Sequence, residues 1–321
     1  MKKWQNCLGC YQKLLASEVG GYHISCSKKL FGTANPPIVD FSADQLEELA
    51  KQSLVRQLGL TGVQPKISVN IEKHKDAPAH RLMIVGLWGG YILKPPTKRF
   101  PNMAVVEDAT MHMAKAAGIR VAHHGLIRLK SGELAYVSRR FDRGKKGKKI
   151  AVEDFCQLSG LLTESKYKTS TEKAGKIILK YASNSGLDAV SFFDLNLFSF
   201  LTGDADRHLK NFSLLTNEVG EVSLSPAYDL LSTKLMPIAD LEEMALTVNG
   251  RKAKIKRADF EQLGRSLGIP SKAIENSFAR LVEAVPSLGA IIDASFLPAD
   301  LKIRYKELVA SRARRLSSLL P

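Results

Sequence analysis

The spacing of apolar and polar residues predicts a helix followed by a small sheet in the first hundred residues. In residues 41–58 the apolar positions recur at intervals of three and four after Ser42, a residue type that caps helix N-termini. The next apolar segments, 67–71, 81–85 and 90–94, are short, and the first alternates apolar with polar residues. Short segments of this kind are typical of strands, so we predict an antiparallel sheet.

A second helix and two more strands are predicted further along. Residues 102–117 place methionine, valine and alanine side chains at helical spacing, and Gly118 supplies a C-terminal stop. Residues 121–129 and 134–141 are then predicted to be strands joined by a turn at 130–133. The order of elements is sheet, helix, sheet.

The second half of the chain is dominated by longer helical patterns. An apolar helix is predicted over residues 191–201, and an irregular segment follows it from 203 to 232. We therefore predict an α+β fold with a small β-rich N-terminal lobe, residues 1–142, and a larger helical C-terminal lobe, residues 143–321. The irregular segment interrupts the helical lobe and is the first place to look for chemistry.

Composition adds charge to this picture. The 321 residues are 45% hydrophobic and 25% charged, which is typical of a globular protein. We expect a cytosolic protein, because no apolar stretch has the length of a membrane span and the N-terminus lacks the apolar run of a signal peptide. The formal charge of +15 favours anionic partners without choosing among nucleic acid, nucleotide phosphates and acidic proteins. Two basic runs are interpreted as a solvated loop and the polar face of the last helix: Arg143, Lys145, Lys146, Lys148 and Lys149, and Lys302, Arg304, Lys306, Arg312, Arg314 and Arg315.

Three of the four cysteines lie near the N-terminus in a metal-like pattern. Cys7 and Cys10 are followed by His23 and Cys26, so two close pairs offer four soft ligands. Such a set can close a tetrahedral structural zinc site. Buried reduced thiols are the simpler interpretation, because cysteine and histidine often pack as small core residues. Both interpretations stay open at this point, with a catalytic role less favoured than either.

The irregular segment carries an aspartate and an asparagine five positions apart. Asp206 and Asn211 reproduce the spacing of a protein-kinase catalytic loop, in which the aspartate orients the acceptor hydroxyl and the asparagine binds Mg²⁺. His208 and Lys210 lie between them and are candidates for neutralising charge in the transition state, or simply for packing the loop. Asp229 follows the next short strand and can complete the oxygen ligands of Mg²⁺.

The N-terminal lobe offers the groups that bind nucleotide phosphates. Lys94 ends an apolar strand and can pair with the α and β phosphates of ATP, held in place by a carboxylate from the neighbouring helix. Glu107 is the candidate for that carboxylate, because Asp108 would point about 100° away on the helix. A tight turn can present backbone N–H groups to the phosphates; its residues are Gly62, Val63, Gln64 and Lys66. Each signal is weak alone, but their order along the chain is the order in a two-lobed protein-kinase-like fold.

Several of these motifs together resemble the HipA family of toxin kinases. They are residues 62–66, 140–143, 152–157, 203–213 and 226–232, which span more than half of the chain. The resemblance implies a serine/threonine kinase toxin of a bacterial toxin–antitoxin system that phosphorylates an aminoacyl-tRNA synthetase. It also implies a HipB-like helix-turn-helix antitoxin as partner, with DNA contacted only through that antitoxin. The glycine turn comes near residue 60, as in the short HipT form, whose missing piece is the small protein HipS.

The resemblance extends to regulation and to the adenine site. HipT-like kinases carry two serines before the glycine turn as autophosphorylation sites, and this chain has Gly59 and Thr61 there. Thr61 is therefore the predicted autophosphorylation site, where a phosphate would oppose ATP binding. The hinge that holds adenine is expected at residues 139–141, with Arg139 and Phe141 as its candidates.

Two other functions share parts of this pattern. A small-molecule phosphotransferase would use the same catalytic residues on a different acceptor. A basic, zinc-bearing nucleic-acid-binding protein would explain the charge and the cysteines, although aromatic residues are only 7% and no helix-turn-helix pattern stands out.

Overall fold

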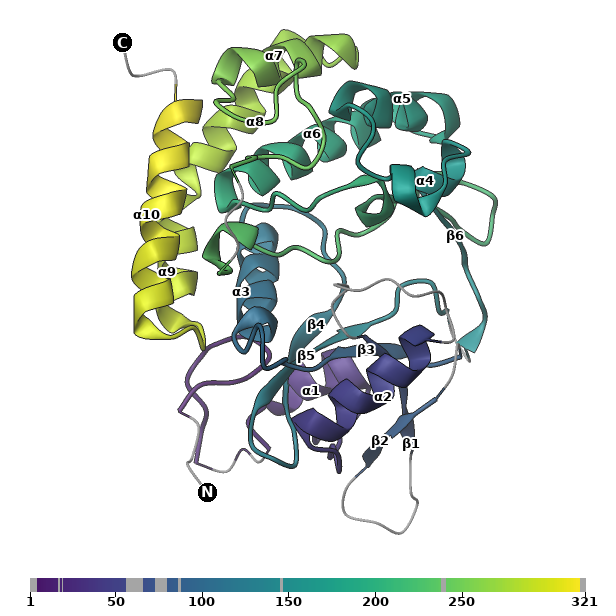
Figure 1. Cartoon of the computed structure of the whole chain (residues 1–321), viewed down its shortest axis with the longest axis vertical. Helices are drawn as coiled ribbons and strands as arrows, with labels where there is room; N and C mark the ends of the chain where they lie inside the picture. The colour runs from purple at the N-terminus through teal and green to yellow at the C-terminus, as the bar shows by residue number, and fades with distance from the viewer. Residues whose placement is uncertain are drawn as a thin grey trace. The chain divides into compact units, whose positions relative to one another are not determined.

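The protein forms two compact units, which are described one at a time (Figure 1). Unit 1 comprises residues 1–109, 122–147 and 294–297, and unit 2 comprises residues 110–121, 148–293 and 298–321. The computed structural model describes residues 5–16, 18, 20–55, 66–72, 80–85, 88–144, 147–237 and 241–317.

Unit 1 is built on a five-stranded antiparallel sheet with the order β2-β1-β3-β5-β4. Its strands are β1 (Ile67–Glu72), β2 (Arg81–Ile84), β3 (Tyr91–Lys94), β4 (His124–Arg128) and β5 (Leu134–Arg139). β3 lies at the centre and carries Lys94 at its end, directly opposite Tyr136 of β5. The sheet predicted from the sequence is confirmed.

Three helices accompany this sheet: α1 (Ile24–Phe31), α2 (Ala43–Val55) and α3 (Met103–Ala116), the last of which continues into unit 2. α2 confirms the predicted helix, and its cap is reciprocal: the Gln45 N–H donates to Ser42 Oγ and the Ser42 N–H donates to Gln45 Oε1. α3 confirms the second predicted helix, and Gly118 adopts the left-handed conformation (φ 84°) expected of a stop.

The strand predicted over 121–129 begins later than expected. β4 starts at His124, whereas Val121 makes a parallel bridge to Ala227 within unit 2. The Ala227 N–H donates to the Arg120 carbonyl at 2.7 Å, so this stretch pairs with a distant segment before the strand begins. Val121 was therefore wrongly assigned to the sheet, whereas the His123 carbonyl accepts from the Arg139 N–H of β5 at 2.8 Å.

Unit 2 is mainly helical, with a small antiparallel sheet of order β6-β7-β8. Its strands are β6 (Ala151–Asp154), β7 (Ser213–Thr216) and β8 (Val222–Leu224). Its helices are α4 (Phe155–Leu158), α5 (Thr171–Tyr181), α6 (Ser185–Thr202), α7 (Arg257–Ser266), α8 (Ser271–Glu283), α9 (Val285–Ala294) and α10 (Ala299–Leu316), with 3-10 turns at Thr163–Ser165, Leu209–Asn211 and Thr233–Leu235.

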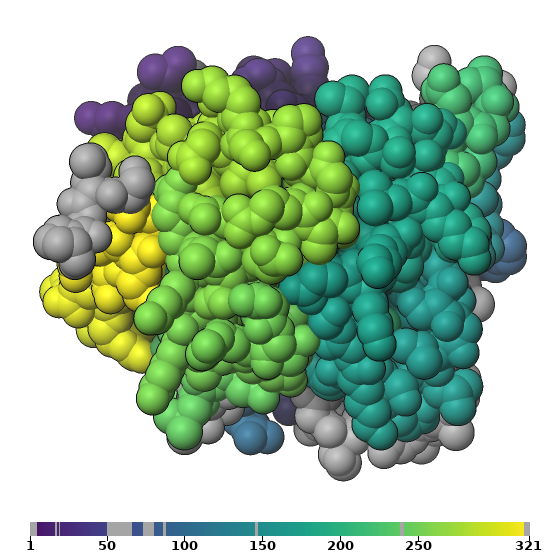
Figure 2. All heavy atoms as spheres, turned by 90° about the horizontal axis from the view of Figure 1, so that it is seen from above, coloured from purple at the N-terminus to yellow at the C-terminus, as the bar shows by residue number. Residues whose placement is uncertain are grey.

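The core of unit 2 surrounds α6. This helix contains the apolar segment predicted at 191–201, begins six residues earlier, and is almost fully buried along its second half. α5, α7, α8 and α10 all pack against it, and α10 also contacts α8 (Figure 1). On the outside, α7 adjoins both α5 and α8, and the space-filling view shows them as one continuous surface (Figure 2). α6 therefore delivers its C-terminal end to a rigidly packed position.

β6 escaped the sequence analysis because its residues alternate between exposed and half-buried positions, without an apolar side to reveal them. Among the helices of the described residues, none combines the length and the apolar character needed to cross a bilayer.

Candidate functional site

The loop that carries Asp206 starts where α6 ends. Gly203 adopts a left-handed conformation (φ 74°), and its N–H donates to the carbonyls of Ser199 and Phe200. A Cβ at Gly203 would lie 2.8 Å from Leu308 Cδ2 and 3.2 Å from Lys234 Cβ, so a side chain there would displace its neighbours. The turn thus needs glycine for both shape and space, and it directs the chain out of the helix toward Asp206.

A buried ion pair fixes the loop from inside. The Arg207 Nε donates to Asp204 Oδ2 at 3.1 Å, and both residues are 1% exposed. The other guanidinium nitrogens donate to backbone carbonyls, those of Asn211 at 2.9 Å, Tyr228 at 2.9 Å and Asp229 at 3.2 Å. Arg207 therefore ties the loop to the segment that carries Asp229. Burial raises the pKa of Asp204, and the charge of Arg207 opposes this rise.

Asp206 lies on the outer side of the same loop and is exposed. The Tyr167 hydroxyl donates a short hydrogen bond to its Oδ1. Desolvation raises the pKa of Asp206, the Tyr167 hydrogen bond and the charge of Lys166 oppose this rise, and the negative charge of Asp229 adds to it. The two carboxylates are therefore close enough to repel one another.

Asn211 and Asp229 fit the ligand set of a small divalent cation. The Asn211 Nδ2 donates to the Asp206 carbonyl at 3.2 Å, so Oδ1 is the atom that this side chain offers to a cation. Asp229 adopts a left-handed backbone conformation (φ 56°), which aspartate tolerates better than most residues. The amide oxygen of Asn211 and the carboxylate of Asp229 are the donor types that Mg²⁺ prefers, and the negative charge of nearby Asp206 adds to the attraction for a cation.

The two residues between Asp206 and Asn211 differ in what they can do. Burial lowers the pKa of His208 to about 4, so its imidazole is neutral near pH 7 and supplies no positive charge. Lys210 donates to Asp154 Oδ2 at 3.1 Å, at the end of β6. Its charge is thus shared with that carboxylate. The catalytic roles foreseen for both residues stay predictions.

The structure brings Lys94 and Glu107 together within unit 1. The Lys94 Nζ donates to Glu107 Oε1 at 2.6 Å, and the two side chains are 7% and 0% exposed. The ammonium also lies 5.5 Å from the ring centroid of Tyr136. Asp108 points elsewhere and accepts hydrogen bonds from Tyr11 and His124, as its position on the helix predicts. The role of Lys94 in ATP binding stays a prediction.

The other predicted nucleotide-binding residues are only partly described. Gly62, Val63, Gln64 and Thr61 lie outside the described residues, and Lys66 is exposed immediately before β1. Arg139 is exposed and Phe141 half-buried at the end of β5, where the Arg140 N–H donates to the Gly90 carbonyl at 2.9 Å. Their role in binding adenine stays a prediction.

Next to this segment, Arg140 and Arg143 both donate to the Asp142 carboxylate. Burial alone would raise the pKa of Asp142, but the two guanidinium groups outweigh it and lower the pKa. The negative charge of Asp142 is thus compensated within unit 1.

Sequence reasoning missed Tyr167 and Arg207 as parts of the site. Arg207 stood inside the recognised loop, but its acceptors are backbone carbonyls, which leave no trace in the residue types. Tyr167 lies 39 positions before Asp206. A lone tyrosine in a polar stretch gives no signal of that distant contact.

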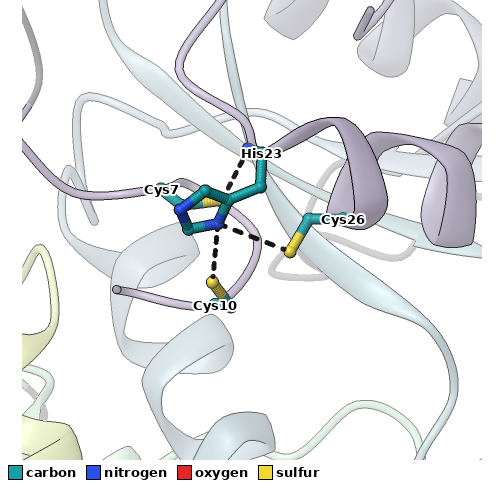
Figure 3. Close-up of side chains that lie close together, drawn as sticks. All are labelled: Cys7, Cys10, His23 and Cys26. Carbon is teal, nitrogen blue, oxygen red and sulfur yellow. Dashed lines mark hydrogen bonds between the residues drawn. The ribbon is translucent and has the colours of Figure 1, made fainter. Parts of the chain in front are cut away.

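A second cluster of chemically competent side chains lies in unit 1 (Figure 3). Cys7, Cys10, His23 and Cys26 place one ligand atom each within 4.8 Å of one another. None of the four cysteines forms a disulfide. The hydrogen bond between Cys7 and Cys10 raises the pKa of Cys7, together with burial, and lowers that of Cys10.

Solved structures define the class of this fold. The chain superposes on HipA of Shewanella oneidensis, solved with HipB and its operator DNA, with a TM-score of 0.67 over 86% of this chain and 71% of that chain, at 21% identity. It also superposes on the Helicobacter pylori proinflammatory kinase CtkA, with a TM-score of 0.52 over 70% of this chain and 86% of that chain, at 19% identity. The fold is the predicted α+β, two-lobed protein-kinase-like fold.

The family follows from the sequence match. The chain belongs to the family defined by the HipA-like C-terminal domain, whose model matches residues 58–288. This confirms the family resemblance drawn from the motifs.

Three relatives show how far the match extends. A Haemophilus influenzae protein provisionally named as a kinase is 26% identical over 87% of this chain and 86% of its own length. The provisionally named kinase Y4mE of Sinorhizobium fredii is 30% identical over 83% of this chain. The serine/threonine-protein kinase toxin HipA of Shewanella oneidensis is 24% identical over 81% of this chain. The match spans only 65% of Y4mE and 64% of that HipA.

Proposed function

We propose that this protein is an ATP- and Mg²⁺-dependent serine/threonine protein kinase that acts as the toxin of a HipA-type toxin–antitoxin system. One observation supports the proposal: Arg207 donates to the backbone carbonyls of Asn211 and Asp229, and so ties the loop of Asp206 and Asn211 to the segment of Asp229 in unit 2. A catalytic aspartate beside two oxygen ligands for Mg²⁺ is the arrangement that phosphoryl transfer from ATP needs.

Each residue has a distinct part in the proposed reaction. Asp206 accepts a hydrogen bond from the acceptor hydroxyl and orients it for in-line attack on the γ-phosphorus. Asn211 and Asp229 hold Mg²⁺, which neutralises charge on the phosphates when bound. Lys94, kept in place by Glu107, pairs with the α and β phosphates. Arg207 touches no reacting atom and acts as a positioning residue.

The relatives suggest the partners. The Shewanella protein was solved with HipB and operator DNA, and a HipB-like antitoxin is the corresponding partner proposed here. The resemblance to HipT adds a HipS-like small subunit and an aminoacyl-tRNA synthetase as the phosphorylated substrate. Thr61 is proposed as an autophosphorylation site that opposes ATP binding.

Expression in bacteria tests this function directly. We expect the wild-type protein to arrest growth and to create a new phosphosite on an aminoacyl-tRNA synthetase, measured by phosphoproteomics. Asp229→Asn should do neither and should lose Mg²⁺-dependent ATP binding in calorimetry, because it removes the charge that holds the cation. Asparagine keeps the left-handed backbone accessible, so folding is preserved.

Two results would contradict the proposal. Growth without arrest or new phosphosites would exclude a toxin kinase, provided that the protein accumulates. Labelling of small metabolites instead of proteins by ATP in a lysate would favour a small-molecule phosphotransferase with the same catalytic residues.

Tyr167→Phe should change the pH dependence of the reaction. Asp206 must be ionised to orient the hydroxyl, so activity falls as the pH drops through its pKa. The Tyr167 hydrogen bond holds that pKa down, and its loss should move the acidic limb of the kcat/KM profile to higher pH. Tyr181→Phe, which changes an exposed tyrosine at the end of α5, is the matched control and should leave the profile unchanged. An unshifted limb in Tyr167→Phe would show that another group sets it.

A further inference from the structure

The cysteine and histidine cluster near the N-terminus takes no part in the proposed reaction, and its geometry is that of a metal site. The His23 Nδ1 lies 3.2 Å from Cys10 Sγ and 3.8 Å from Cys26 Sγ. In a tetrahedral zinc site, with Zn–S and Zn–N bonds of about 2.3 and 2.0 Å, nitrogen and sulfur ligands stand about 3.6 Å apart. The imidazole nitrogen therefore stands near the separation from two sulfurs that zinc requires, and all four ligand atoms lie within 4.8 Å of one another.

The ligands are also oriented by their surroundings. The His23 Nε2 lies 3.1 Å from the Lys13 carbonyl and 3.6 Å from the Glu18 carboxylate, so it carries the proton and Nδ1 faces the sulfurs. Cys7 Sγ accepts from the N–H groups of Gly9 and His23 at 3.4 and 3.3 Å. Histidine held by a carbonyl, and thiolate sulfur receiving backbone N–H groups, are the usual supports of a metal site.

Packing argues against cysteines that serve only as small core residues. Cys7 is fully buried, whereas Cys10, His23 and Cys26 are half-exposed, so burial of apolar surface does not explain their convergence. A Cβ on Gly9 would lie 2.6 Å from Tyr22 Cε1 and 3.3 Å from Cys26 Cβ. Glycine between the first two cysteines thus lets their turn approach α1 closely.

We propose that Cys7, Cys10, His23 and Cys26 bind one structural Zn²⁺ that holds Tyr11 against α3. Three thiolates and one imidazole saturate a tetrahedral ion, which leaves no position for substrate and marks the site as structural. The fourth cysteine, Cys156, lies in unit 2 and donates to the Leu161 and Leu162 carbonyls.

The consequence of this site reaches the lysine that is proposed to bind ATP. Tyr11 follows Cys10 directly, has a left-handed backbone (φ 65°), and donates to Asp108 Oδ2 at 2.6 Å. Asp108 neighbours Glu107 on α3, and Glu107 binds Lys94. The turn of Cys7 and Cys10, which leads directly into Tyr11, therefore fixes the part of α3 that positions Lys94.

Metal analysis of the purified 321-residue chain tests the proposal without measuring activity. We expect about one zinc per chain, and a cobalt-substituted protein should show the visible bands of tetrahedral thiolate coordination. Cys26→Ser should lose the metal and unfold at a lower temperature, Cys156→Ser should keep it, and His23→Cys should also keep it as a four-thiolate site. Wild-type protein with less than about a tenth of an equivalent of zinc and no cobalt bands would overturn the proposal.

The variants have an independent check in case Cys26→Ser does not fold. A thiol-modifying mercurial added to wild-type protein should release zinc, which a chromophoric chelator detects. The amount released should rise with each cysteine modified and reach its limit when three cysteines have reacted. Full zinc retention in folded Cys26→Ser would show that the ligands are assigned wrongly.

Discussion

Arg207→Ala should lower the free energy of unfolding by roughly 3–5 kcal/mol, the range measured when one partner of a buried ion pair is removed. The change leaves Asp204 buried without its charge partner and takes hydrogen bonds from three backbone carbonyls. Arg207→Lys should lie between the wild type and alanine, because an ammonium can replace the charge but cannot reach all of these acceptors. Urea unfolding measures both.

Arg251→Ala is the matched control for this stability loss. Arg251 pairs with Asp259 at 3.7 Å but is 59% exposed, so its removal should cost about 1 kcal/mol or less. Where Arg207→Ala remains folded, its Mg²⁺-nucleotide affinity should also fall, because Asn211 and Asp229 are no longer tied together. A loss no larger than that of the control would mean that the loop is held by other contacts.

Asp206→Asn should reduce phosphoryl transfer by about 10²–10⁴-fold, the usual contribution of a positioned acid or base. The amide has nearly the same shape but cannot accept a proton from the acceptor hydroxyl. Binding of Mg-ATP should be retained or slightly tighter, because a negative charge that repels the phosphates is gone. Single-turnover transfer to a protein substrate and calorimetric binding separate the two effects.

The control for Asp206→Asn is Asp293→Asn on α9. Asp293 is exposed and pairs with Lys306 at 2.7 Å, so the same change there should leave both transfer and binding unaffected. A variant of Asp206 that keeps its rate within about tenfold of the wild type would assign the acceptor hydroxyl to another group.

The sequence predicts those parts of the fold and site that rest on local pattern. The period of the strand and the helix places Lys94 and Glu107 on facing elements, and a glycine marks the end of α3. The spacing of Asp206 and Asn211 can be recognised in the sequence because both residues lie in one short loop. Each of these signals is contained within a few consecutive residues.

Contacts between distant segments could not be predicted. Arg207 binds backbone carbonyls of Tyr228 and Asp229, which any residue type would offer, and Tyr167 reaches Asp206 across 39 positions. The early start assigned to β4 has the same cause, since the pairing of Val121 with Ala227 uses only backbone groups. The cysteine pattern located its cluster and left both zinc and buried thiols open, with thiols the simpler interpretation; the orientation of His23 supports the zinc proposal.

Two separate requirements restrict which residues can occupy position 229 during evolution: the left-handed backbone conformation and the proposed need for a negative charge. The conformation admits glycine, asparagine and aspartate readily and disfavours β-branched and bulky residues. Among these three, only aspartate brings a negative charge. A relative that no longer needs the cation should therefore first acquire asparagine or glycine at this position. The residue found there should distinguish an active relative from one that has lost activity but still folds.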